Sequence, residues 1–201
     1  MRLCVIPARG GSKRIPRKNI KEFVGQPIIS YSIKVAIASN CFDRIIVSTD
    51  DAEISEVAKS FGAEVPFLRS QELSDDYAGT MPVIKHAIEW FDNLEQPPTE
   101  VCCIYATAPF VQVDAIRNAY AQMRHENADY CFSLTRFASP IQRAINLTPE
   151  KRINMFYPDY FEKRSQDLVE AYHDAGQFYW GKAEAFRLQL PLFSSAASPY
   201  I

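Results

Sequence analysis

Apolar residues along this chain alternate between short continuous runs and stripes at helical spacing. A continuous apolar run over 3–8 predicts a buried strand, and Ile29, Ile33 and Ala36 then recur on one face of a helix. The same alternation continues to about residue 137. Repeated strand and helix units imply right-handed crossovers and a mostly parallel sheet covered on both faces. The pattern predicts an α/β chain with a Rossmann-like, three-layer fold.

The elements after the first strand and helix are predicted from the same alternation of apolar runs and helical stripes. The run over 101–109 is the most apolar and is predicted to be a central strand, whereas Pro66 limits its segment to an edge strand or a short piece of strand. Further strands are predicted at 44–51, 63–69 and 129–137, with helices at 54–61, 84–91 and 116–123.

The rhythm changes at Ala138. The stretch 138–170 mixes prolines, aromatic residues and charges without clear periodicity, so we expect irregular hairpins or an arm that leaves the sheet. A strand and a short helix resume over 176–186. The last residues, "SSAASPYI", show no closing element, which predicts that a C-terminal segment is missing. The whole chain, 1–201, is expected to form one domain with this arm.

Composition limits the function classes. The 201 residues are 47% hydrophobic and 23% charged with a net charge of -2, which suits a packed globule and gives no general basic field for nucleic acid. No apolar stretch approaches the ~18 residues of a membrane span, and no signal peptide opens the chain. We therefore expect a cytoplasmic protein without nucleic-acid or membrane partners. The five cysteines are odd in number, which favours buried thiols over disulfides or a zinc site.

The stretch "ARGGSKRIPRKN" (8–19) directly follows the first predicted strand. Gly10 and Gly11 allow backbone conformations closed to other residues, so their amides could face an anion beside the cations Arg9, Lys13 and Lys18. A polyphosphate is the natural partner, although a solvated basic loop is the alternative. The stretch lacks the P-loop pattern and the G-x-G-x-x-G fingerprint of dinucleotide folds.

Three other clusters of polar residues near predicted strands are candidates for the site. Asp50 and Asp51 fit a helix cap better than a metal site. The polar stretch 68–80 could close over a base or ribose, or could be a plain surface loop. His173, beside Asp174, could serve a site, whereas His86 and His125 lie in predicted helices.

Taken together, these motifs resemble those of the CMP-sugar-acid synthetases, the cytidylyltransferases that activate nine-carbon sialic-type acids. The stretch "IPARGGSKRIPRKN" resembles the opening signature of that family, and "STDD", "LRSQELSDDYAGT" and "TAP" fall where it has later motifs. The segment "RSQDLVEAYHDAGQFYWGKAEAF" is similar to the pseudaminic acid branch. The resemblance covers nearly the whole chain.

The resemblance implies a nucleotidyltransferase in which the anomeric 2-hydroxyl of the sugar acid attacks the α-phosphate of CTP and releases pyrophosphate. The residues that it implies for catalysis are Arg9, Lys13, Lys18 and Arg164. Those that it implies for nucleotide binding are Ala8, Arg9, Gly10, Gly11, Ser12, Asn19, Arg69, Ala78 and Thr80. Those that it implies for the sugar are Tyr105, Gln166, Asp167, His173 and Asp174.

Departures from the sialic acid enzymes fall on the expected sugar side. Tyr105 replaces a glutamine, and His173 with Asp174 replaces an arginine or glutamate, so pseudaminic acid is preferred over N-acetylneuraminate or legionaminate as the substrate. The family also implies Mg²⁺ on a D-x-D stretch, but the sequence contains no D-x-D. The metal ligands are therefore expected beyond Ile201, or the chain is expected to be catalytically impaired. A homodimer formed through the arm is implied too. A nucleotide-binding module without turnover and a structural protein are the alternatives.

Overall fold

The computed structural model describes residues 1–75, 78–92 and 96–201, which divide into two compact units. The first unit comprises Met1–Ser133 and Gly176–Tyr200, and the second comprises Leu134–Ala175 with Ile201. The second unit includes the whole stretch 138–170 that the sequence predicts as an arm.

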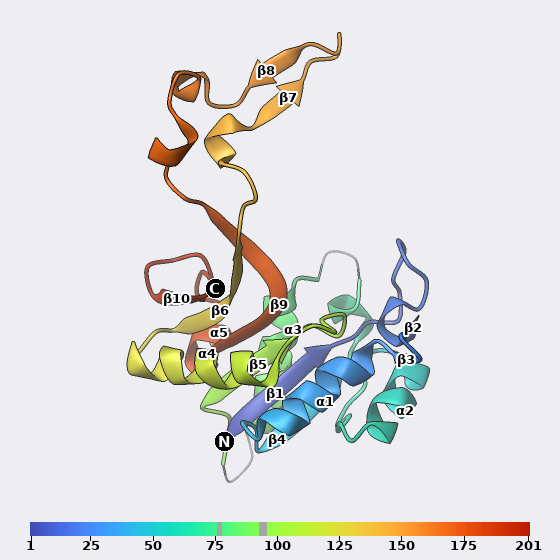
Figure 1. The fold of residues 1–201 in the computed structure, drawn as a ribbon. Helices are drawn as coiled ribbons and strands as arrows, with labels where there is room; N and C mark the ends of the chain where they lie inside the picture. Colours follow the sequence, from blue (N-terminus) through green and yellow to red (C-terminus); the bar gives the residue numbers. More distant parts are fainter. Residues whose placement is uncertain (76–77, 93–95) are drawn as a thin grey trace. The chain divides into compact units, whose positions relative to one another are not determined.

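The sheet has six strands in the order β10-β6-β9-β5-β1-β4 (Figure 1). β1 pairs in parallel with both β4 and β5, and β10 pairs in parallel with β6, whereas β9 is antiparallel to β5. The boundary between the units falls within β6 and β9. The predicted mostly parallel sheet is confirmed. The strands are β1 (Arg2–Pro7), β4 (Arg44–Ser48), β5 (Glu100–Ile104), β6 (Tyr130–Arg136), β9 (Tyr172–Lys182) and β10 (Ala197–Tyr200).

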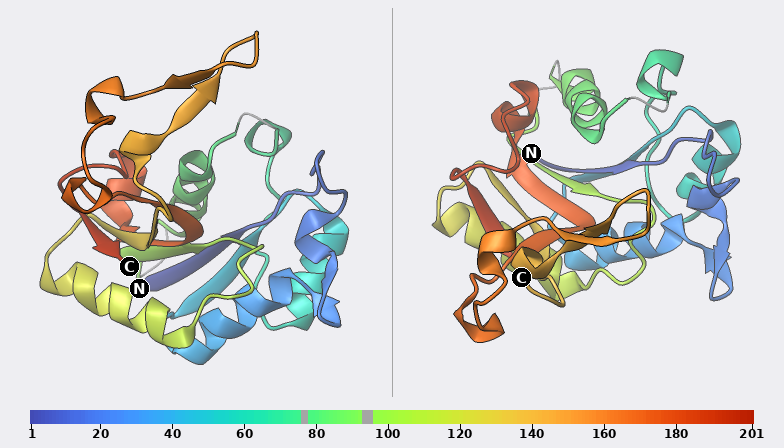
Figure 2. Two further views of the ribbon diagram at one scale, coloured as in Figure 1. Left: turned by 45° about the horizontal axis from the view of Figure 1, so that its top comes forward. Right: turned by 90° about the horizontal axis from the view of Figure 1, so that it is seen from above.

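Helices cover both faces of this sheet. Figure 2 shows α1 and α4 on one face and α3 and α5 on the other. The helices are α1 (Ile29–Ser39), α2 (Ala52–Ser60), α3 (Thr80–Phe91), α4 (Val113–His125) and α5 (Ala183–Arg187). The apolar stripes predicted these helices because their residues face the sheet: Ile29 and Ile33 of α1 and Ile84 of α3 are all buried. His86 and His125 lie in α3 and α4, as predicted.

Trp180 of β9 links the sheet to α4. Its side chain is fully buried, and its indole N–H donates a 3.0 Å hydrogen bond to the carbonyl oxygen of Ile116. The ring stacks on Phe42 at 5.0 Å and contacts Tyr120 at 4.7 Å between ring centroids. A buried tryptophan with a partner for its N–H contributes a large apolar area without an unsatisfied donor, so it stabilises this layer of the core.

All five cysteines are buried free thiols, as the sequence predicts. Burial raises the pKa of the Cys131 thiol to about 11 and raises the pKa of the Cys4 and Cys102 thiols well above the usual range. Among the described helices none is long and apolar enough to cross a membrane.

The two edges of the sheet refine the predictions. The segment 63–69 forms isolated parallel bridges, from Glu64 to Ile46 of β4 and from Leu68 to Thr49 just after β4, which suits the edge or short piece predicted from its proline. The expectation that the last residues contain no closing element is wrong, because β10 pairs with β6. Pro199 lacks an N–H and makes this segment look like a loop, but an edge strand tolerates proline.

The second unit is built around a hairpin of β7 (Ile145–Leu147) and β8 (Ile153–Met155). Three short 3-10 turns accompany it, at η3 (Ile141–Arg143), η4 (Pro158–Tyr160) and η5 (Ser165–Asp167). This confirms the irregular hairpins expected for 138–170.

Candidate nucleotide-binding site

A cavity of about 250 Å³ opens in the first unit at the carboxyl ends of β1 and β5. Ligands of open parallel sheets bind at this edge, where the strands end and the loops begin. Three segments form its wall: the loop after β1, the loop that leads into α3, and the loop after β5. The lining residues are Pro7, Arg9, Lys18, Asn19, Arg69, Leu73, Ala78, Gly79, Thr80, Val83, Tyr105, Ala106 and Thr107.

The loop after β1 brings two cations to the cavity. Arg9 and Lys18 line it, and the buried Asn19 donates a 2.9 Å hydrogen bond from Nδ2 to the carbonyl oxygen of Arg9. The Arg9 guanidinium donates to the carbonyl oxygen of Asp75. Asn19 therefore holds the two ends of the basic stretch together, so that Arg9 and Lys18 face the same space.

A third cation, Arg69, ends the segment 63–69 that lies beside β4. Its side chain is only 3% exposed, and its Nε donates a 3.1 Å hydrogen bond to the Ser74 hydroxyl. Its backbone N–H donates to the carbonyl oxygen of Thr49 at 2.7 Å, which ties this loop to the end of β4. Burial lowers the pKa of the Arg69 guanidinium, while the negative charge of Asp50 opposes that shift.

The N-terminus of α3 completes the wall. Gly79 precedes the helix and Thr80 begins it, and both residues line the cavity. The Thr80 hydroxyl lies 3.2 Å from the Tyr105 hydroxyl, and the Tyr105 ring packs on Tyr179 with 5.3 Å between centroids. A helix N-terminus beside three cationic side chains favours an anionic ligand.

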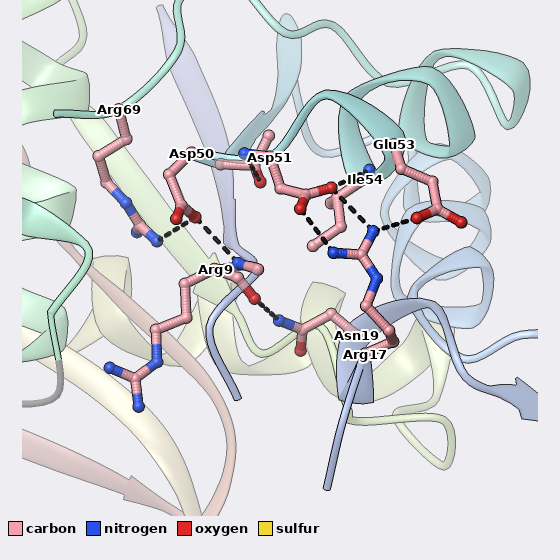
Figure 3. A network of polar contacts seen from close by, with 10 residues as sticks. Arg9, Arg17, Asn19, Asp50, Asp51, Glu53, Ile54 and Arg69 are labelled. Atoms are coloured by element: carbon pink, nitrogen blue, oxygen red, sulfur yellow. Dashed lines mark hydrogen bonds and ion pairs between the residues drawn. The ribbon is translucent and has the colours of Figure 1, made fainter. Parts of the chain in front are cut away.

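Two adjacent carboxylates at the end of β4 hold the basic loop (Figure 3). Asp51 accepts hydrogen bonds from both Nη atoms of Arg17, at 2.6 and 2.9 Å, and caps α2 by accepting from the Ile54 N–H at 2.9 Å. The predicted cap is confirmed for Asp51 but not for Asp50, whose Oδ1 accepts from the Gly10 N–H instead. Glu53 also accepts from Arg17. The hydrogen bond from Arg17 lowers the pKa of the Asp51 carboxyl to about 2.

The role of Gly10 differs from the expectation. Gly10 and Gly11 are not among the residues with positive φ, and the Gly10 N–H donates to Asp50 Oδ1 at 2.9 Å. The expected special backbone conformation is therefore absent, and the Gly10 N–H is bonded to the Asp50 carboxylate, while a role of Gly10 toward the nucleotide stays a prediction. What requires glycine here is space, because a Cβ at Gly10 would lie 2.7 Å from Asp51 Oδ2, whereas a Cβ at Gly11 would meet no atom within 4 Å.

The residues predicted for catalysis, for the nucleotide and for the sugar divide into three groups, of which two belong to the first unit. Those that line the cavity are Arg9, Lys18, Asn19, Arg69, Ala78, Thr80 and Tyr105. Those that belong to the same loop without lining it are Ala8, Gly10, Gly11, Ser12 and Lys13. Asp76 and Tyr77 of the stretch 68–80 lie outside the described residues. The functional roles of these residues stay predictions.

The remaining predicted residues belong to the second unit. Arg164 donates to both carboxylate oxygens of Asp167, at 2.7 and 3.3 Å, with Gln166 between them in η5. His173 Nδ1 lies 3.0 Å from the carbonyl oxygen of Asp174, and its ring contacts Phe137 edge-on at 4.7 Å. Their predicted roles toward the sugar stay predictions.

The Asp50, Asp51 and Arg17 network was not predicted as part of the site. A signal for it exists in the sheet register, since β1 and β4 are parallel and Pro7 lies opposite Ser48. Residues that follow Pro7 therefore meet residues that follow Ser48. The order in which strands lie side by side in the sheet is known only from the folded structure. The sequence alone therefore did not indicate which acidic residues face the basic loop.

The carboxylates beside the cavity do not form a ready metal site. Within 1–75, 78–92 and 96–201, no three His, Cys, Asp or Glu side chains are grouped so as to hold a metal ion. Asp51 is paired with Arg17, and Asp50 accepts from the Gly10 amide. Mg²⁺ prefers free carboxylate oxygens and nucleotide phosphates, so these two side chains do not fit it as they stand.

Comparisons with known proteins agree with this geometry. A model of the cytidylyltransferase family matches residues 3–186. The chain belongs to the cytidylyltransferase family. It is 46% identical over 199 residues to the pseudaminic acid cytidylyltransferase of Campylobacter jejuni subsp. jejuni serotype O:2, covering 99% of this chain and 86% of that relative. The cytidylyltransferases are nucleotidyltransferases, which confirms the predicted enzyme class.

Two further similarities extend the comparison. The cytidylyltransferase chain is 35% identical over 194 residues to a Helicobacter pylori protein, covering 96% of this chain and 37% of that one. That protein is named pseudaminic acid cytidylyltransferase and UDP-2,4-diacetamido-2,4,6-trideoxy-beta-L-altropyranose hydrolase. A solved CMP:2-keto-3-deoxy-manno-octonic acid synthetase in complex with CTP has a TM-score of 0.70 at 16% identity, covering 97% of this chain and 80% of that one. This second similarity supports the fold.

We expect Gly10→Ala to destabilise the basic loop, since the added methyl group would displace Asp51 from Arg17 and from the α2 cap. Crowding of this kind costs about 1–3 kcal/mol. Urea unfolding measures the change. Gly11→Ala is the matched control, because the same methyl group meets open space there. Equal stability of the two variants would contradict the steric role of Gly10.

The Asp51 pKa gives a second prediction. Its value falls from 3.8 to about 2 on folding, so Asp51 contributes stability above its unfolded pKa and loses it as the pH falls toward the folded pKa. We expect the stability advantage of the wild type over Asp51→Asn to shrink from about pH 5 to about pH 2.5 in urea titrations. Asp114→Asn, which removes an 83% exposed carboxylate, is the control. A pH-independent advantage would contradict the prediction.

Proposed function

We propose that this cytidylyltransferase transfers CMP from CTP to the anomeric 2-hydroxyl of a nine-carbon sialic-type acid, with pseudaminic acid as the preferred substrate. The observation that carries the proposal is the 46% identity, over 99% of the chain, to a relative named for pseudaminic acid. The cationic cavity at the ends of β1 and β5 supports CTP as the nucleotide donor.

The bonds exchanged define what the protein must supply. The sugar 2-oxygen forms a bond to the α-phosphorus of CTP, the bond from that phosphorus to the bridging β-oxygen breaks, and pyrophosphate leaves while the hydroxyl loses its proton. As that bond breaks, negative charge accumulates on the oxygen atoms of the departing pyrophosphate. Arg9, Lys18 and Arg69 line the cavity and can neutralise this charge. We therefore assign to them the positioning of the nucleotide, including its base, and the electrostatic stabilisation of its triphosphate.

Acid–base chemistry is not assigned to the cavity wall. None of the described residues that line it is a carboxylate or an imidazole. The resemblance implies Mg²⁺, which would supply further charge neutralisation of the phosphates when bound. The requirement for Mg²⁺ stays a prediction, tested by adding a chelator to the assay.

We expect pyrophosphate release to depend on both CTP and pseudaminic acid. The wild type is incubated with CTP, Mg²⁺ and separate nine-carbon acids: pseudaminic acid, legionaminic acid and N-acetylneuraminic acid. The proposal predicts the highest kcat/KM for pseudaminic acid, with CMP-sugar detected by mass spectrometry. A preference for one of the other acids would reassign the substrate. CTP binding without turnover on any acid would favour a nucleotide-binding module.

The same assay tests the cationic wall. We expect Lys18→Met to lower kcat/KM for CTP by about tenfold or more, as befits the loss of one charge-assisted contact to phosphate. Lys21→Met removes the same charge three residues later from a side chain that does not line the cavity, and it should leave kcat/KM nearly unchanged. Equal losses in the two variants would contradict the assignment of Lys18.

We also propose that two copies of the chain associate through the second unit. In the β7–β8 register Leu147 lies opposite Ile153, and these side chains share a face with Ile145. They are 67%, 72% and 51% exposed, respectively, in the single chain. The exposed aromatic residues of this unit are Phe137, Phe156, Tyr157, Tyr160 and Phe161. Exposed apolar side chains on one face of a hairpin favour burial in a protein interface, and homodimers are the commonest oligomers.

Sedimentation velocity tests the homodimer. We expect a dimer at micromolar concentration for the wild type and a shift toward monomer for Ile153→Lys, because a charge would be buried in the interface. Asn146→Lys is the control, since Asn146 lies opposite Asn154 on the other face of the same hairpin. A monomeric wild type, or equal behaviour of both variants, would overturn this interface.

A further inference from the structure

Asp50 lies between the side chain of Arg69 and the basic loop that follows β1 (Figure 3). Its Oδ1 accepts a 2.9 Å hydrogen bond from the Gly10 N–H in the basic loop. The same oxygen lies 3.9 Å from Nη2 of Arg69, which belongs to the loop before α3. Asp50 does not line the cavity, whereas Arg69 does. One carboxylate oxygen thus joins two loops that are far apart in the sequence.

Arg69 depends on this carboxylate. Its side chain is 3% exposed, and a guanidinium stays charged and presents five N–H donors in a fixed plane. In the part of the chain that the structure describes, Asp50 is the one carboxylate paired with it, and the Ser74 hydroxyl is its other side-chain partner. A buried cation with one ion pair is held in place by that pair, because leaving the charge uncompensated is costly.

The other charges around Arg69 increase the need for Asp50. Arg9 lies near enough to disfavour the charged form of Arg69, and burial acts in the same direction. Asp50 opposes both effects. The neighbouring carboxylate cannot replace it, since Asp51 is engaged by Arg17 and by the N-terminus of α2. The two adjacent aspartates therefore have different partners and, we infer, different duties.

We propose that Asp50 is a positioning residue for nucleotide binding, which fixes the orientation of the Arg69 guanidinium toward the cavity without touching the nucleotide. The inference rests on the proposed CTP site and deepens it. The alternative is that Asp50 serves only the fold, by accepting the Gly10 N–H. The positioning role needs the negative charge of Asp50, whereas the structural role needs only an oxygen that accepts a hydrogen bond. Two substitutions of Asp50 distinguish these roles, because one removes the charge and the other keeps it.

Asp50→Asn keeps an oxygen where it can accept from Gly10 and removes the charge that faces Arg69. Asp50→Glu keeps the charge and displaces the oxygen by one methylene group. If Asp50 acts through Arg69, calorimetry will show CTP binding weakened about tenfold in Asp50→Asn and weakened less in Asp50→Glu. In steady-state assays Asp50→Asn should raise KM for CTP while kcat changes by less than about twofold. Wild-type affinity in Asp50→Asn would overturn the proposal.

A double-mutant cycle shows whether the effect passes through Arg69. In an Arg69→Met background, Asp50→Asn should weaken CTP binding no further, because the side chain that it orients is absent. Additive losses would overturn the proposal. Glu64→Gln, which removes the ion pair of Arg44 at the other end of β4, controls for a general loss of charge and should leave CTP affinity unchanged.

The outcomes separate this inference from the proposed function. If the wild type transfers CMP and Asp50→Asn binds CTP as tightly as the wild type, the inference fails and the function stands. If the wild type binds CTP but transfers CMP to no acid, the function fails, and the calorimetric comparison still tests Asp50. If the wild type does not bind CTP, both fail. Thermal melting confirms that each variant is folded.

Discussion

Charge compensation at the end of β4 is the constraint on which the candidate site depends. The stretch after β1 gathers several cations within a few residues, and such a loop would repel itself if nothing opposed it. Asp51 and Glu53 accept hydrogen bonds from Arg17. Asp50 accepts a hydrogen bond from the Gly10 N–H and forms an ion pair with Arg69. With those partners fixed, Arg9, Lys18 and Arg69 remain along the cavity. Asp51 thus pairs with the cation that anchors the loop, and Asp50 pairs with one of the three cations that line the cavity.

The sequence indicated the framework of this arrangement because periodicity reports which residues are buried. The continuous apolar runs of β1 and β5 and the stripes of α1 and α3 predicted a parallel sheet with helices on both faces, and the ends of those strands then located the candidate site. Seven of the residues singled out from the motifs line the cavity. Their identities carried the chemistry, and their positions after strands placed them at the same edge.

What the sequence did not indicate depends on contacts between distant segments. Gly10 looked like a residue chosen for its backbone freedom, but its φ is ordinary and the limit is the approach of Asp51, 41 residues later. The strand β10 was missed because serine, alanine and proline do not form an apolar run, and its pairing with β6 comes from its place at the sheet edge. Both facts follow from neighbours in space, which no local pattern contains.

The burial of all five cysteines has a practical consequence for studying motion in this protein. Thiolates are the reactive form, and burial raises the pKa of the Cys4, Cys102, Cys103 and Cys131 thiols. A maleimide dye or spin label would therefore pass over the native thiols and couple to a cysteine newly placed on the surface. Labels introduced in the first and second units could then report the distance between the units in solution without any change to the native core.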